Sequence, residues 1–364
     1  METMANMTTI STTKIIKKIA GYFIIFPLSL SLGALASAHL VTTHDSGELT
    51  CDDPSLYTAQ KDERGVPFNH RKQLLTDLDQ KFEEFRHLNE SPSPLSQFES
   101  SNENLNYNIK KVITINSGYS IYRYEIGQPK APWKVLITSG IHAGTEPHSV
   151  VVALNLINDL IKNHKKFSDV YFVIYPNLNP WGFLHGTREN EEHIDLNRVF
   201  KREKIESDSM QIVANSLHDE SFNLAMDLHG GIGRKTFFAI RSKDDQGLSE
   251  RAMQFLGESQ LLLESTSKQY PDYAHHAKFS KRYCLVAPGV SETKTPGTLK
   301  SHVSQISDFA YTMEYPGKLT PLEIQSKFQD LIYSYIEKLR FIPSNPKGIG
   351  ASTVELESNR ECPD

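Results

Sequence analysis

Histidines and carboxylates cluster near the ends of short apolar runs in this sequence. His142 and Glu146 follow one such run, His229 follows a second, and Glu314 ends a third. Ligands of open α/β sheets bind at the carboxyl ends of the strands, so these distant side chains are expected to converge. Two imidazoles and one carboxylate can hold zinc with one position open to water, and a further carboxylate can take that water's proton. Each residue alone also fits a loop histidine, a helix-start carboxylate or a surface charge, so the pattern as a whole carries the prediction.

Three further motifs lie in order between Glu146 and His229. They are the loop Asn179-Pro180-Trp181-Gly182, an arginine at position 188, and the segment Asp195-Leu196-Asn197-Arg198. Together with the histidines and carboxylates, this order closely resembles the zinc carboxypeptidases of the carboxypeptidase A superfamily, over about residues 110 to 340. That superfamily also includes murein peptide amidases and deacylases of the aspartoacylase and succinylglutamate desuccinylase type.

The resemblance implies roles for the four acid–base residues. His142, Glu146 and His229 become the ligands of one zinc ion per chain, and Glu314 becomes the general base. The family usually places two residues between the first His and the Glu, whereas three intervene here. We expect the extra residue to bulge in the loop, where Gly144 supplies conformational freedom. His148 is the alternative ligand, but its position early in a predicted helix favours an outward direction.

The resemblance also implies roles for two arginines. Arg188 would polarise the scissile carbonyl and stabilise the oxyanion, while Asn197 and Arg198 would hold a substrate carboxylate. The chemistry fits, because a guanidinium matches a carboxylate with two parallel hydrogen bonds and an adjacent amide adds a donor. The alternative for each arginine is an ion pair with a neighbouring acid, such as Asp195.

Other residues of the predicted site are less well defined. Asp227 lies two residues before His229 and fits a group behind the metal site or a buried charge partner. Tyr270, Tyr273 and Tyr283 are candidates for the mobile tyrosine of classical family members. Lys300 lies where the family builds the wall of its specificity pocket, and a cation there would favour an acidic or carboxylate-rich substrate.

Hydrophobic periodicity predicts the elements that must position these residues. Strands are expected at 112–115, 120–124, 134–139, 170–174, 222–228, 236–240 and 310–315, and helices at 72–88, 147–163, 207–217, 248–263 and 321–339. The order strand 134–139, helix 147–163, strand 170–174 is one βαβ unit. We therefore predict an α/β fold, a three-layer α/β/α sandwich with a mixed, largely parallel central sheet.

The ends of the chain differ from its middle. Residues 1–38 combine three lysines with an uncharged run that ends in Ala36-Ser37-Ala38, which predicts a signal peptide cleaved after Ala38. A membrane anchor is the alternative. We expect an exposed lead-in at 39–68, the zinc carboxypeptidase-like catalytic domain at 69–345 and a polar tail at 346–364. Whether residues 39–110 support the domain or form a removable pro-segment stays open.

Composition narrows the class of protein. The 364 residues include 44 acidic and 39 basic side chains, for a formal charge of −5, and 38% are hydrophobic. A packed body is expected and nucleic acid binding is not, since no basic run could neutralise a row of phosphates. Of the three cysteines, Cys51 and Cys362 could form a disulfide after export, whereas Cys284 fits a buried free thiol.

Three functions remain open from the sequence. The leading one is an exported, secreted or periplasmic, zinc-dependent carboxypeptidase that hydrolyses an amide next to a free carboxylate, with peptides or cell-wall peptides as substrates. The second is an N-acyl amino acid deacylase, although such relatives carry a β-rich domain after the catalytic Glu, whereas a helix is predicted after Glu314. The third is a non-catalytic binding protein with the same fold. We expect a monomer with no stable membrane span once the signal is removed.

Overall fold

The structure is a computed structural model that describes residues 68–90, 107–201, 203–231, 236–256, 284–287, 289–292, 295–317 and 319–342. The predictions for the signal peptide, most of the lead-in, the terminal cysteines, the three candidate tyrosines and the polar tail lie outside these residues. The domain boundaries therefore stay predictions. No helix within the described ranges is long and apolar enough to cross a membrane.

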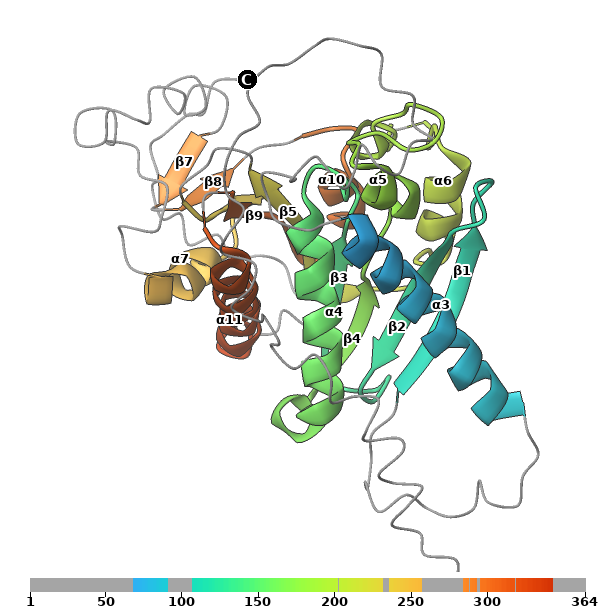
Figure 1. Cartoon of the computed structure of the whole chain (residues 1–364). Helices are drawn as coiled ribbons and strands as arrows, with labels where there is room; N and C mark the ends of the chain where they lie inside the picture. The colour runs from blue at the N-terminus through green and yellow to red at the C-terminus, as the bar shows by residue number, and fades with distance from the viewer. Residues whose placement is uncertain are drawn as a thin grey trace, which may run out of the picture. The chain divides into compact units, whose positions relative to one another are not determined.

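A single mixed sheet organises the described part of the chain (Figure 1). Its strands are β1 (Tyr107–Thr114), β2 (Ser120–Ile126), β3 (Trp133–Ser139), β4 (Val170–Tyr175), β5 (Phe222–Gly231), β6 (Phe238–Arg241), β7 (Cys284–Ala287), β8 (Val290–Glu292) and β9 (Ser307–Pro316). They lie in the order β1-β2-β4-β3-β5-β9-β6-β8-β7. The four central strands β4, β3, β5 and β9 are parallel to one another, and antiparallel pairs flank them.

Helices cover both faces of this sheet. They are α3 (Phe68–Glu90), α4 (Pro147–Lys162), α5 (Pro180–His185), α6 (Asp208–Asn215), α7 (Leu248–Met253), α10 (Leu299–Val303) and α11 (Pro321–Leu339), with 3-10 turns at His164–Phe167, Leu196–Arg198 and Gln254–Leu256. Apolar side chains of α3, α4, α7 and α11 pack on one face, and those of α6 and α10 pack on the other. The three-layer α/β/α sandwich predicted from the sequence is confirmed.

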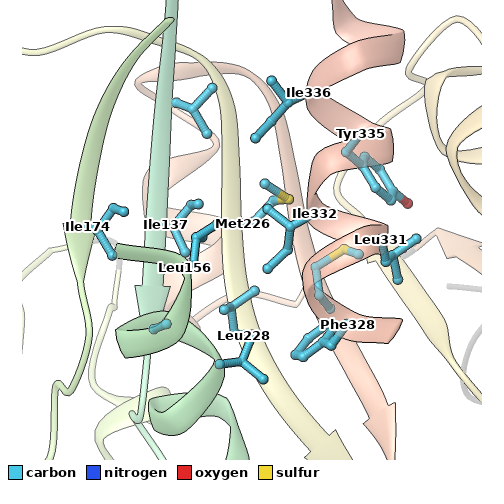
Figure 2. Close-up of a cluster of buried hydrophobic side chains, with 14 of the residues drawn as sticks. Ile137, Leu156, Ile174, Met226, Leu228, Phe328, Leu331, Ile332, Tyr335 and Ile336 are labelled. Atoms are coloured by element: carbon cyan, nitrogen blue, oxygen red, sulfur yellow. The ribbon is translucent and has the colours of Figure 1, made fainter. Parts of the chain in front are cut away.

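Period-two burial explains why the central strands form. Val135 and Ile137 of β3 face the core under α4 and α11, whereas Leu136 between them faces the core under α6 and α10. Figure 2 shows the first core, in which Leu156 of α4 and Ile332 of α11 lie over the strands. Both faces are therefore apolar, as a parallel sheet covered on two sides requires.

Most predicted elements are present, and the differences have local reasons. Strand β5 continues through His229 to Gly231 and β9 continues through Glu314 to Pro316, because the two strands stay paired to that point. His229 therefore lies inside a strand rather than beyond it, and Glu314 lies within β9, as predicted. The elements β7, β8, α5 and α10 were not predicted, since segments of three to six residues are too short to show a period. Helix α7 ends at Met253, and most of the predicted helix beyond it lies outside the described residues.

Candidate metal centre

A turn between β3 and α4 carries the first two predicted ligands. Strand β3 ends at Ser139, Gly140 adopts a left-handed φ of +70°, and residues 141–145 form turns that reverse the chain. Glu146 is the N-cap residue of α4 and Pro147 occupies the first helical turn. The Glu146 side chain makes no capping hydrogen bond, so its carboxylate is free to point toward the sheet.

The three predicted metal ligands converge in a buried cluster. One ligand atom from each of His142, Glu146 and His229 lies within 4.8 Å of the others, and all three residues are buried. The Glu146 carboxylate lies 3.5 Å from Nδ1 of His142 and 2.8 Å from Nδ1 of His229. Nδ1 of His142 is buried and makes no hydrogen bond. A buried imidazole nitrogen without a hydrogen-bond partner, next to a second imidazole and a carboxylate, can bind a divalent metal ion. Two nitrogen ligands and one carboxylate oxygen are a set that zinc favours.

Two aspartates hold the outer nitrogens of the histidines. Nε2 of His142 lies 2.8 Å from Asp195, and Nε2 of His229 lies 2.8 Å from Asp227. If each Nε2 donates its proton to the carboxylate, each Nδ1 presents a lone pair to the metal position. Such carboxylate–histidine pairs fix the tautomer and the ring orientation of metal ligands. Asp227 thus lies behind the ligand cluster, which is one of the two positions that the sequence left open for it. The sequence did not indicate the contact between Asp195 and His142.

The charges of the cluster shift the pKa values of its members strongly. Burial alone would lower the pKa of His229, but the carboxylates of Asp227 and Glu146 raise it well above its ordinary value. Burial alone would raise the pKa of Glu146, but the imidazoles of His229 and His142 hold it well below its usual range. In the metal-free protein the raised pKa therefore favours the imidazolium form of His229, which carries a second ring proton. A metal ion bound at the ring would displace that proton.

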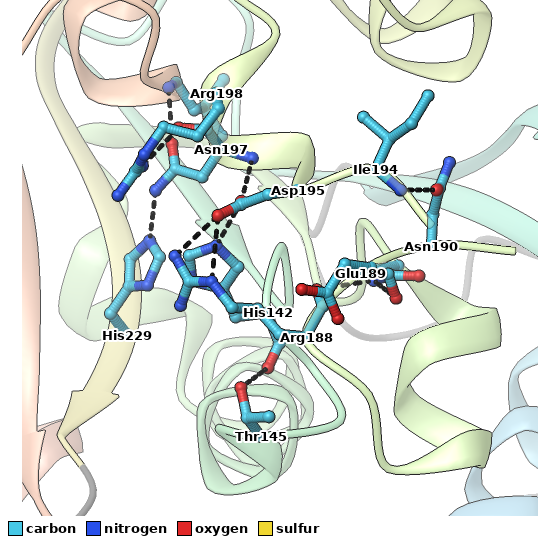
Figure 3. Close-up of polar contacts among 12 residues, drawn as sticks. His142, Thr145, Arg188, Glu189, Asn190, Ile194, Asp195, Asn197, Arg198 and His229 are labelled. Carbon is cyan, nitrogen blue, oxygen red and sulfur yellow. Dashed lines mark hydrogen bonds and ion pairs between the residues drawn. The ribbon is translucent and has the colours of Figure 1, made fainter. Parts of the chain in front are cut away.

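Loops between β4 and β5 add the predicted arginine and amide (Figure 3). Asn179 accepts a hydrogen bond from the Gly182 amide at 2.9 Å and donates to the Glu189 carbonyl at 3.1 Å, which ties α5 to the next loop. Arg188 then reaches Asp195 at 2.9 Å and Glu146 at 3.8 Å. The Arg188 guanidinium therefore lies beside the ligand cluster. It also forms an ion pair with Asp195, which was the alternative role expected for this arginine.

Asn197 and Arg198 lie on the same side of the cluster. The Asn197 amide nitrogen is 3.3 Å from Nε2 of His229, and its amide oxygen accepts a hydrogen bond from the Leu299 amide at 2.8 Å. Arg198 is exposed, and its Nη1 donates to the Asn197 carbonyl at 2.6 Å. The structure thus brings Asn197 next to His229 and Arg198 against Asn197, and the role of both residues toward a substrate stays a prediction.

Strand β9 places Glu314 beside His229. The two residues are direct partners in the parallel register of β5 and β9, so their side chains leave the sheet on the same face. Glu314 is partly exposed, whereas His229 is buried. The general-base position predicted from the sequence is therefore compatible with the pairing.

Two expectations about the ligand loop are wrong. Gly144 does not adopt a positive φ, and what it supplies is space: a Cβ there would lie 2.2 Å from the Gly182 carbonyl oxygen and from the Thr187 backbone. His148 does not face outward, because it is buried with its ring edge-on to Tyr315, and it lies outside the ligand cluster.

Lys300 does not act as a surface cation. Only 1% of it is exposed, and its ammonium group lies 3.4 Å from the Arg241 carbonyl of β6. Burial lowers the pKa of Lys300 to about 8. Because Lys300 is buried, the expectation that it attracts an acidic or carboxylate-rich substrate is not supported.

Comparisons with known proteins agree with the fold. A family described as a protein of unknown function, DUF2817, matches residues 116–220. A candidate metallopeptidase from Shewanella amazonensis SB2B is 17% identical, with 64% of this chain and 87% of that chain covered and a TM-score of 0.52. A comparison with curated proteins finds no match.

Two further solved structures carry the carboxypeptidase name. The metallo-carboxypeptidase from Burkholderia cenocepacia is 17% identical, covers 65% of each chain and has a TM-score of 0.49. The carboxypeptidase A from Helicoverpa armigera is 15% identical, with 66% of this chain and 70% of that chain covered and a TM-score of 0.47. The likeness to the Shewanella amazonensis structure shows a shared fold, which agrees with the α/β/α sandwich predicted from the sequence, and a shared fold does not establish an activity.

The ligand cluster predicts one zinc ion per chain that depends on His229. His229→Ala removes one imidazole from the set, so metal analysis after dialysis against trace zinc should find near-stoichiometric metal in the wild type and little in the variant. His218→Ala is the matched control, because the His218 side chain is 81% exposed and belongs to no cluster with the ligands. Full zinc occupancy of His229→Ala would exclude this site.

The raised pKa of His229 predicts a pH-dependent stability of the metal-free protein. Above pH 6.5 the folded state holds a proton that the unfolded state has lost, so the free energy of unfolding should fall as pH rises, by up to about 1.4 kcal/mol per pH unit. Urea unfolding with a chelator between pH 6.5 and 8 measures this slope. His229→Gln should flatten it and His218→Gln should not, whereas equal slopes in the wild type and His229→Gln would contradict the assignment.

Proposed function

We propose that this chain is an exported zinc-dependent carboxypeptidase that hydrolyses an amide bond next to a free carboxylate. The observation that carries the proposal is the buried set of His142, Glu146 and His229, whose histidines are each fixed by an aspartate behind them. Within this cluster Nδ1 of His142 is buried without a hydrogen-bond partner, and a metal ion held by the three side chains would supply that partner.

The residues around the cluster have separate roles in this hydrolysis. Zinc, when bound at the three ligands, supplies Lewis acidity and lowers the pKa of a water molecule to about 7. Glu314 accepts a proton from the attacking water and later delivers it to the leaving amine. Arg188 donates hydrogen bonds to the carbonyl oxygen as negative charge develops on it, in a position next to Glu146.

Asn197 and Arg198 give the reaction its preference for an amide bond next to the free carboxylate of the substrate. The Asn197 amide lies next to His229 and the Arg198 guanidinium contacts the Asn197 carbonyl, so a carboxylate held by these two groups would place the neighbouring amide bond near the ligand cluster. In the structure Asn197 is anchored through the Leu299 amide, which holds its donor group in one orientation. Arg198 is exposed and can reach a substrate carboxylate with two parallel hydrogen bonds.

The segment after β9 favours the peptidase over the deacylase. Helix α11 begins five residues after Pro316, with a capping box formed by Thr320 and Glu323, and packs on the sheet through Phe328 and Ile332. A deacylase of the aspartoacylase type would carry a β-rich domain at this point of the chain. The lysines, the uncharged run and the Ala36-Ser37-Ala38 end of residues 1–38 suit export, and peptides of the cell envelope would then be the nearest substrates.

Glu314→Gln should separate metal binding from catalysis. The amide cannot accept the proton of the attacking water, so zinc content and folding should stay unchanged while kcat falls by about 10²–10⁴-fold. Glu337→Gln is the control, since Glu337 is a half-exposed residue of α11 that pairs with Lys166. Turnover of Glu314→Gln near the wild-type level would place the general base elsewhere.

Amidation of the substrate carboxylate should mimic loss of Arg198. Arg198→Ala is expected to lower kcat/KM on a free-carboxylate peptide by more than tenfold, equal to about 1.4 kcal/mol, because it removes a charge-assisted pair. Amidating the peptide should slow the wild type similarly and add little further loss in the variant, since both changes delete one interaction. Equal cleavage of acid and amide by the wild type would exclude exopeptidase specificity and leave the zinc hydrolase standing.

A further inference from the structure

A buried arginine of the N-terminal helix contacts the metal-ligand loop. Arg71 lies in the first turn of α3, 4% exposed, and its Nη1 donates to the Gly144 carbonyl at 3.2 Å and to the Phe183 carbonyl at 2.9 Å. The guanidinium carbon is 5.7 Å from the centre of the Phe183 ring. Figure 1 shows the start of α3, in blue, close to α4 and α5. One side chain thus joins three segments that lie far apart in the sequence.

Both carbonyl partners belong to the machinery of the site. Gly144 is the middle residue between the ligands His142 and Glu146, and Phe183 lies in α5, directly before the loop that carries Arg188. Within the ligand loop, the Glu146 amide donates to the His142 carbonyl at 2.9 Å, so the loop is closed on itself around Gly144. A shift of the Gly144 carbonyl would therefore move both ligands.

The ligand loop and the Arg188 loop are also in direct contact at this point. The Gly144 Cα lies so close to the Gly182 carbonyl and the Thr187 backbone that a methyl group would overlap them at 2.2 Å. Thr187 is the neighbour of Arg188 and its amide donates to the Gly182 carbonyl at 3.2 Å. Arg71 therefore lies where the loop of the metal ligands and the loop of the oxyanion residue meet.

We propose that Arg71 is a positioning residue of the metal centre, and that α3 is in this sense a part of the active site rather than a detachable segment. Its guanidinium fixes the Gly144 and Phe183 carbonyls relative to each other, and so sets the spacing of His142, Glu146 and Arg188. The inference rests on the proposed metal-dependent function. A guanidinium suits this task, because its planar fork is rigid and donates several hydrogen bonds at once, which a lysine cannot reproduce.

Metal affinity tests the role of Arg71 without any activity measurement. Zinc dissociation constants are measured by chelator competition for the wild type, Arg71→Met, Arg71→Lys and the control Arg86→Met, which alters a half-exposed arginine of the same helix. Groups that orient metal ligands typically change affinity by 10–100-fold, so Arg71→Met should weaken zinc binding at least tenfold and Arg71→Lys by an intermediate factor. Arg86→Met should bind as the wild type does.

The shift of the melting temperature on zinc addition separates positioning from general support. A residue that only stabilises the fold lowers the melting temperature of the metal-free and zinc-loaded forms equally, whereas weaker binding reduces the shift itself. A normal zinc affinity and shift in Arg71→Met would overturn the proposal, and if this variant does not fold, Arg71→Lys decides by the same criterion. Failure of the wild type to bind zinc would instead overturn the proposed function, so the two failures are distinguishable.

Discussion

Parallel pairing of β3, β5 and β9 is the constraint on which the rest of the site depends. Ser139 at the end of β3 pairs with Leu228, and His229 in the next position of β5 pairs with Glu314 of β9. Because parallel strands end at one edge of the sheet, residues 85 to 89 positions apart reach the same place with side chains on defined faces. The apolar cores on both sides fix this register, since a slip by one residue would turn every side chain to the other face.

Burial of four ionisable groups at that edge is tolerated because they satisfy one another. Glu146 contacts both histidines, Asp227 holds His229, and Asp195 joins His142 to Arg188. An isolated buried charge would be costly, but each group here has a partner of opposite sign or a hydrogen bond. Asp227 is itself held by the Thr138 hydroxyl at 2.9 Å, so the network continues into the neighbouring strand. The contacts that offset the cost of burying these charges also orient the imidazoles toward the position of a metal ion.

The extra residue in the ligand motif has a structural explanation. With three residues between His142 and Glu146, the loop bulges until Gly144 touches the Gly182 and Thr187 backbone, and Arg71 of α3 holds the bulge from outside. The N-cap position of Glu146 is kept, so the carboxylate still reaches the cluster. The altered spacing, which motivated the possibility of a non-catalytic protein, is thus compatible with an intact set of ligands.

The sequence by itself determined the α/β class and the types of the longer elements, and it singled out the three candidate ligand residues, because periodicity and residue chemistry are local properties. It could not decide that Asp195 fixes His142, that His148 points inward, or that Lys300 is buried. Nor did it show the contact from Arg71 to carbonyls 73 and 112 residues away. Those features depend on how the loops pack against the sheet and α3, and only the tertiary structure brings such distant backbone groups within hydrogen-bond distance.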